Sequence, residues 1–99
     1  MNLAEFRESL QDKNPPVGLS YALQALWWDG KGNWERAHES AQQDEGTDGA
    51  WVHAYLHRKE GELANAQYWY RRAEHAAGYG DLQREWESMV GELLRSSSQ

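Results

Sequence analysis

Two histidines, His53 and His57, stand four positions apart in the run HAYLH. On a helix this spacing puts both imidazoles on one face, where they can bind one metal ion together. Catalytic zinc needs three protein ligands, and the chain has Ala54 where the zincin motif carries a glutamate. His38 and Glu35 are the candidate third ligands, because their helix should pack against the helix of the pair.

A buried polar network is the other interpretation of the histidine pair, and it is the one that we expect. A neutral imidazole donates a hydrogen bond from one nitrogen and accepts one at the other. His53 and His57 can therefore tie neighbouring helices together through His38, Glu35 or Tyr70. On this interpretation the protein has no metal and no other cofactor, and protonation of the pair should reduce its stability. A metal or acid–base centre of His53, His57 and His38 is the alternative.

The charge balance argues against two classes of partner. The chain carries 16 acidic and 10 basic side chains, and its net charge of −6 repels phosphate backbones and anionic membrane surfaces. No segment approaches the ~20 apolar residues that span a bilayer. We therefore expect no nucleic-acid partner, no membrane association and a cytoplasmic location. The absence of cysteine also excludes disulfides and thiolate metal sites.

Glycine and proline divide the chain into helix-length pieces, and none has the alternating apolar pattern of a half-buried strand. The sequence therefore predicts an all-α protein of five or six antiparallel helices in one domain, residues 1–95, with a frayed tail at 96–99. We expect a first hairpin at 17–45, a second hairpin at 47–77 and a C-terminal capping helix at 81–95. The expected helices cover residues 3–10, 17–29, 34–44, 50–60, 62–77 and 81–95.

The last of these helices has the clearest amphipathic stripe. Its apolar residues recur at helical spacing, at Leu82, Trp86, Met89, Val90, Leu93 and Leu94. Stacked helical hairpins need their terminal faces covered. We therefore expect this stripe to fold back on residues 63–77 and to close the open end of the stack.

The two predicted hairpins are related by an internal repeat. A shift of 29 residues aligns residues 19–44 with residues 48–73. The identical pairs in this alignment are Ala25 with Ala54, Gly32 with Gly61, and Ala37 with Ala66. The two glycines fall in the expected hairpin turns, where a left-handed backbone is needed.

Part of the second hairpin resembles the tetratricopeptide repeat (TPR) family. Gly61, Ala66, Tyr70 and Ala73 follow the spacing of the family's turn and second helix. The resemblance covers about half of the chain, and the repeat period of 29 residues departs from the family's usual value of about 34. The run 50–73 is also similar to stretches of small uncharacterised bacterial proteins, which implies no activity.

The TPR resemblance implies a concave groove that holds an extended peptide. The groove positions of the family correspond to Ala22, Leu26, Asp29, Trp51, Tyr55 and Arg58. The expected function is therefore non-enzymatic binding of a protein or peptide, by a monomer or weak homodimer, with Arg58 available for a carboxylate. The partner-binding residues would be Leu26, Asp29, Trp51, Tyr55 and Arg58. A small metal-dependent or acid–base enzyme using His53, His57 and His38 is the alternative function.

Overall fold

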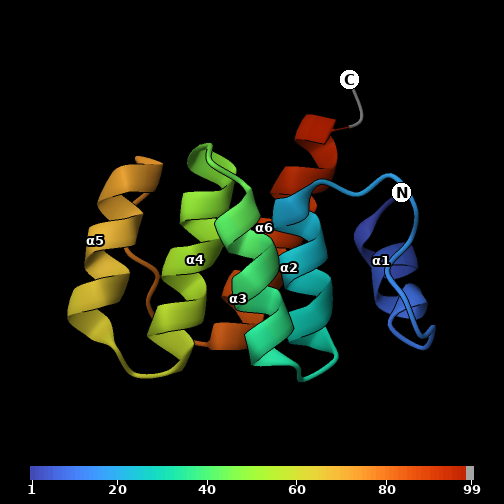
Figure 1. Ribbon diagram of the computed structural model, residues 1–99, viewed down its shortest axis with the longest axis horizontal. Coiled ribbons are helices and arrows are strands. Elements are labelled where there is room, and N and C mark those ends of the chain that lie inside the picture. Colours follow the sequence, from blue (N-terminus) through green and yellow to red (C-terminus); the bar gives the residue numbers. More distant parts are fainter. Residues whose placement is uncertain (98–99) are drawn as a thin grey trace.

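The computed structural model describes residues 1–97, and within them it contains six helices and no strand (Figure 1). The helices are α1 (Leu3–Ser9), α2 (Tyr21–Gly30), α3 (Trp34–Gln43), α4 (Thr47–Lys59), α5 (Leu63–Ala73) and α6 (Leu82–Ser97). The predicted all-α class is confirmed. None of the helices within residues 1–97 has both the length and the apolar character needed to cross a membrane.

Four of the helices form two hairpins that pack side by side. Helix α2 packs on α3, α4 packs on α5, and α3 joins the two pairs by packing on α4. Gly32 and Gly61 occupy equivalent turns, with φ of 82° and 80°. A residue with a side chain is strained at such φ values, so glycine permits both turns. The predicted hairpin turns are therefore confirmed.

Several helix ends differ from the expected ones for local reasons. Helix α2 starts at Tyr21, four residues later than expected, because the Ser20 side chain caps it by accepting from the amide of Leu23. Helix α5 stops at Ala73, four residues earlier than expected, where Glu74 turns left-handed with φ of 59°. Helix α4 starts at residue 47, earlier than the expected 50.

Helix α6 is longer than expected and lies in a different place. It runs to Ser97, so residues 96 and 97 are helical, while the rest of the predicted tail lies outside the described residues. Its principal neighbours are α2, α4 and α1, and not the α5 region on which we expected it to fold. Figure 1 shows α6 crossing behind the hairpins. The helix therefore covers the α2–α4 face of the stack.

Buried tryptophan side chains make hydrogen bonds to residues far away in the chain. Trp27 Nε1 donates to Ser9 Oγ at 3.0 Å, and Trp86 Nε1 donates to the Leu26 carbonyl at 2.9 Å. Both rings are buried, so each bond satisfies a donor that would otherwise be costly to bury. Three small residues of the second hairpin, Ala54, Ala66 and Ala73, are also buried.

Candidate functional site

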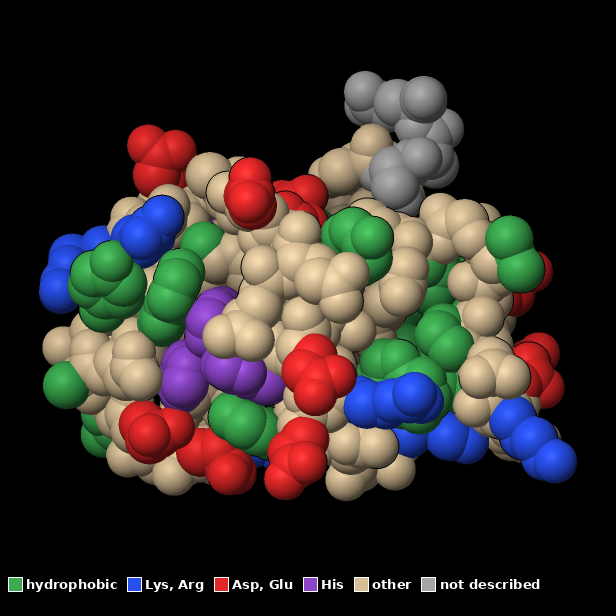
Figure 2. All heavy atoms as spheres, viewed as in Figure 1, with side chains coloured by type: hydrophobic (Ala, Val, Ile, Leu, Met, Phe, Trp, Pro, Cys, Tyr) green, Lys and Arg blue, Asp and Glu red, His purple; other side chains and the backbone are tan. Residues whose placement is uncertain are grey.

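Three histidines from the first and second hairpins meet at one point. His38 on α3 lies with its Nε2 atom 2.9 Å from Nε2 of His53 on α4. His57, one turn further along α4, completes a group whose ligand atoms all lie within 4.8 Å of one another. Figure 2 shows histidine side chains gathered on the face viewed. The predicted tie through His38 is present, whereas Glu35 is exposed and does not belong to the group.

Glu62 is a fourth member of this site that the sequence did not reveal. Its Oε1 atom lies 2.9 Å from Nδ1 of His57. In the repeat alignment Glu62 takes the place of Asn33, whose side chain caps α3 by accepting from the amide of Arg36. The Glu62 side chain makes no such cap on α5. The residue at this helix start is thus used to orient a histidine and not to stabilise the helix end.

Two tryptophan rings enclose the histidines. Trp34 stacks on His38 with ring centres 4.8 Å apart, and Trp69 stacks on His53 with ring centres 4.0 Å apart. The Trp34 ring is itself fixed, because its Nε1 atom donates to the Leu56 carbonyl at 3.0 Å. Stacking holds the imidazole planes in place and keeps water from one side of each ring. The planes of His38 and His53 are therefore held by their neighbours, and His53 and His57 are buried.

Burial lowers the pKa of two histidines of this group, His53 and His38. The pKa of His53 is lowered to about 4, first by burial and then by the neighbouring His38 and His57. Burial also lowers the pKa of His38, helped by His57 and opposed by Glu62 and Glu39. A neutral imidazole keeps one unprotonated nitrogen, which can accept a hydrogen bond or bind a metal ion.

The metal-free protein should become less stable as pH falls from about 6.5 to 4. The pKa of His53 is lower in the folded chain than the unfolded value of about 6.5, so only the unfolded chain takes up this proton in that window. The contribution of His53 is complete above pH 6.5, and about 3 kcal/mol of it should be lost by pH 4.

Urea unfolding in the presence of a chelator measures this loss when the parent and the His53→Gln variant are compared at several pH values. Carboxylates titrate in both proteins, so the difference between them isolates His53. The stability advantage of the parent should shrink toward pH 4. An advantage that stays constant with pH would contradict the buried neutral imidazole.

The residues expected to line a peptide groove lie under α6. Leu26, Asp29, Trp51 and Tyr55 are all buried, and the side chain of Arg58 is only 13% exposed. The expected exposure of this groove is therefore wrong. These residues are buried because the amphipathic stripe of α6 packs against the apolar face of α2 and α4.

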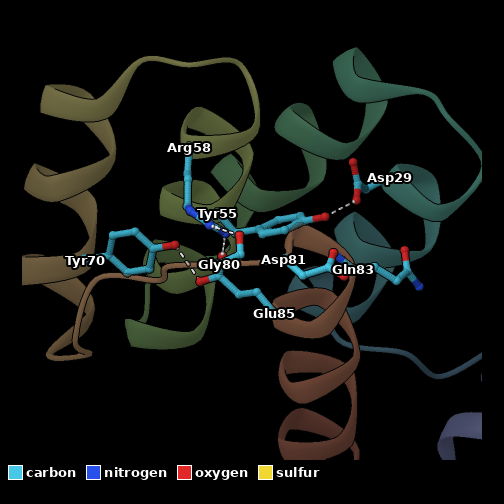
Figure 3. A network of polar contacts seen from close by, with 8 residues as sticks. All are labelled: Asp29, Tyr55, Arg58, Tyr70, Gly80, Asp81, Gln83 and Glu85. Carbon is cyan, nitrogen blue, oxygen red and sulfur yellow. Dashed lines mark hydrogen bonds and ion pairs between the residues drawn. The ribbon is translucent and has the colours of Figure 1, made fainter.

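Polar contacts hold α6 against this face (Figure 3). Arg58 Nη1 lies 2.7 Å from Oε1 of Glu85 on α6, and Arg58 Nη2 donates to the Gly80 carbonyl. Tyr70 donates its hydroxyl proton to the other oxygen of Glu85, and so it does not join the histidines as we had considered. We call Arg58, Tyr70 and Glu85 the α6 latch.

A second polar contact lies beside the α6 latch. Tyr55 donates its hydroxyl proton to Asp29 at 3.0 Å, and Lys59 Nζ lies 2.9 Å from the same carboxylate. Burial, followed by the charge of Asp29, raises the pKa of Tyr55. The phenol therefore stays protonated and acts as a hydrogen-bond donor.

No protein-family model, curated protein or solved structure matches this chain. The candidate site is therefore defined by its own geometry. The histidine group brings three imidazoles together, whereas the polar groove residues already have partners: Arg58 pairs with Glu85 on α6, and Tyr55 donates to Asp29 on α2.

Proposed function

We propose that this protein binds one divalent transition-metal ion, most simply Zn²⁺, through His38, His53 and His57. The observation that carries the proposal is the convergence of their ligand atoms to within 4.8 Å of one another. Imidazole nitrogens are preferred ligands of zinc, copper and nickel, and a chain without cysteine offers these metals no thiolate.

The hydrogen bonds of the group leave the nitrogens suitably oriented for a metal. Glu62 occupies Nδ1 of His57, which leaves Nε2 of that ring as the available ligand. A carboxylate on the second nitrogen is the usual partner of a metal-bound histidine, because it fixes the tautomer and makes the ligand more basic. Glu62 is therefore assigned the role of orienting His57.

The spacing of the rings needs little change to accept zinc. Two nitrogens bound tetrahedrally at 2.0–2.1 Å from zinc lie about 3.3 Å apart, and the Nε2 atoms of His38 and His53 are 2.9 Å apart. A shift of a few tenths of an ångström, with the proton of the donating Nε2 transferred to Nδ1 of the same ring, would replace their hydrogen bond by two bonds to the metal. The polar network predicted from the sequence then corresponds to the metal-free state of the same site.

Three histidine ligands leave one position of a tetrahedral ion open. Structural zinc sites are closed by four protein ligands, whereas catalytic sites keep a position for water or substrate. The sequence left two functions open, and this ligand set favours a small metal-dependent enzyme over a peptide-binding protein. The neutral state of His53 and His38 at pH 7 supports metal binding, because the metal ion then has no proton to displace from these rings.

Metal titration of the purified protein tests the proposal. After treatment with chelator, the parent should bind one Zn²⁺ or Co²⁺ per chain, measured by calorimetry and by the visible absorption of Co²⁺. His53→Ala should abolish this binding, and Glu62→Gln should weaken it by about 10- to 100-fold. Far-UV circular dichroism on each variant checks that it is folded.

The fourth histidine of the chain provides the matched control. His75 stacks on Trp51 with ring centres 3.8 Å apart and does not belong to the group. His75→Ala should therefore leave metal affinity unchanged. Failure of the folded parent to bind a stoichiometric ion, or an equal loss in His75→Ala and His53→Ala, would refute the proposed site.

Peptide binding at the α2–α4 face is a second proposal. It is supported by the fact that this face already holds a helix, with Leu26 accepting from Trp86 and Arg58 paired with Glu85. A partner would have to take the place of α6. A labelled peptide of residues 82–95 should then bind the Trp86→Ala chain more tightly than the parent, and equal affinities would remove the groove from consideration.

A further inference from the structure

A pocket of about 690 Å³ adjoins the histidine group. It lies between α5 and the turn that connects α3 with α4, and small residues line part of it, namely Ala41, Gly46, Gly49 and Ala50. A side chain at Gly49 would collide with the Asp44 backbone, because its Cβ atom would lie 2.3 Å from that carbonyl oxygen. The volume is within the range of sites that bind small molecules.

His53 belongs both to the metal centre proposed above and to the wall of this pocket. Trp69, which stacks on His53, is also part of the wall. A molecule in the pocket would therefore contact Trp69, one face of which is covered by His53, and reach the edge of the histidine group. Of the three histidines, His53 is the one that lines the pocket.

Arg72 supplies the positive charge of the pocket. Its guanidinium carbon lies 5.1 Å from the centre of the Trp69 ring, and Nη1 donates to the Tyr68 hydroxyl at 3.0 Å. The aromatic neighbours fix the position of the guanidinium, yet Arg72 is exposed and has donors left for a ligand. A planar guanidinium suits a carboxylate.

Two acidic residues on the opposite wall restrict the charge of the ligand. Asp44 and Glu45 also line the pocket, and Asp44 Oδ1 accepts from the Gly46 amide at 2.9 Å. A ligand with one negative charge is attracted by Arg72 and by a divalent metal ion. A second negative charge on the ligand, directed toward Asp44 and Glu45, would be repelled. The balance of charges favours a monoanion over a dianion such as a phosphate monoester.

We propose that the pocket binds a small carboxylate whose charge is shared between the metal held by the three histidines and Arg72, with its apolar part on Trp69. This inference rests on the proposed metal centre and names its ligand class. Arg72 is a ligand-binding residue in this assignment, and the metal ligands remain those of α3 and α4.

Benzoate is a suitable probe, because it combines one carboxylate with an aromatic ring. Added to the Co²⁺-loaded parent, it should change the visible absorption of the metal and give a saturable binding curve. Benzamide has the same shape without the charge and should bind at least about tenfold more weakly. Phenyl phosphate, a dianion at pH 7.5, should also bind more weakly than benzoate.

Neighbouring arginines on α5 provide a matched pair of variants. Arg72→Gln should raise the dissociation constant of benzoate by about tenfold or more while Co²⁺ affinity stays at the parental value. Arg71→Gln removes the same charge one residue away, outside the pocket lining, and should have little effect.

The outcomes of these experiments distinguish a failure of the carboxylate pocket from a failure of the proposed metal centre. A parent that binds no Co²⁺ removes the proposed function itself. The parent could bind Co²⁺ without a change of its spectrum on addition of benzoate, or Arg72→Gln could leave the affinity for benzoate unchanged. Either result would overturn the carboxylate pocket and leave the metal centre in place. Tighter binding of phenyl phosphate than of benzoate would overturn the assignment of a monocarboxylate.

Discussion

Replacement of Trp86 by alanine should lower the free energy of unfolding by about 3 to 5 kcal/mol, the usual cost of removing a large buried ring. Trp86 is only 3% exposed and lies beside Phe6 of α1, with ring centres 5.8 Å apart. The substitution also leaves the buried Leu26 carbonyl without its indole donor. The substitution therefore removes contacts of α6 with both α1 and α2.

Thermal and urea unfolding measure this loss. In a domain of this size the melting temperature should fall by more than about 10 °C. Tyr79→Ala is the control, since this aromatic side chain is 91% exposed and its removal should change stability by no more than about 0.5 kcal/mol. A loss below 1 kcal/mol for Trp86→Ala would mean that α6 is not an integral part of the core.

Removal of the Glu85 carboxylate should be nearly as costly, at about 3 to 5 kcal/mol. The side chains of Arg58 and Glu85 are 13% and 11% exposed, so Glu85→Ala leaves a guanidinium charge largely buried without its partner. The Tyr70 hydroxyl loses its acceptor at the same time. Glu85→Gln keeps the shape and one oxygen acceptor, and it should cost less than alanine.

A glutamate two positions away is the matched control for this prediction. Glu87 pairs with Arg7, but their side chains are 32% and 45% exposed, so Glu87→Ala should cost no more than about 1 kcal/mol. Raising the salt concentration should weaken the exposed pair and leave the Glu85 effect largely unchanged, because buried charges are poorly screened. Equal losses for both variants would show that the α6 latch contributes no more than a surface contact.

The features that sequence reasoning predicted correctly are local ones. Gly32 and Gly61 end helices because only glycine adopts the required backbone at no cost, and this holds wherever the hairpin packs. The stripe of α6 correctly identified its buried face, with Trp86 and Met89 in the core. Periodicity tells which side of a helix is buried, but it does not tell what covers that side.

The position of α6 was mispredicted for that reason. The expected neighbour, α5, follows from treating the chain as an open stack that needs a cover at its end. Yet a connection from Glu74 to Asp81 is long enough to carry α6 to another face, and the α2–α4 face offers the backbone acceptor of Leu26 for the Trp86 indole. Such a pairing between residues far apart leaves no local pattern.

The candidate site was only partly visible in the sequence. The spacing of His53 and His57 indicated the pair, and the expected packing of the two hairpins brought in His38. Glu62 was missed because a residue before a helix is ordinarily interpreted as part of its start. A usable signal was present, since the repeat alignment places a glutamate five positions after His57 where the other copy has Asn33, a better capping residue.

The distance along the chain between Trp86 and Leu26 also has a consequence for synthesis on the ribosome. These bonded residues are 60 positions apart, so at about 5 to 20 residues per second the indole is made roughly 3 to 12 s after the carbonyl that it binds. Helices and helical hairpins form in microseconds to milliseconds. The apolar faces of α2 and, later, of α4 therefore stay uncovered in the nascent chain during this interval, in which a chaperone or another nascent chain can contact them before α6 does.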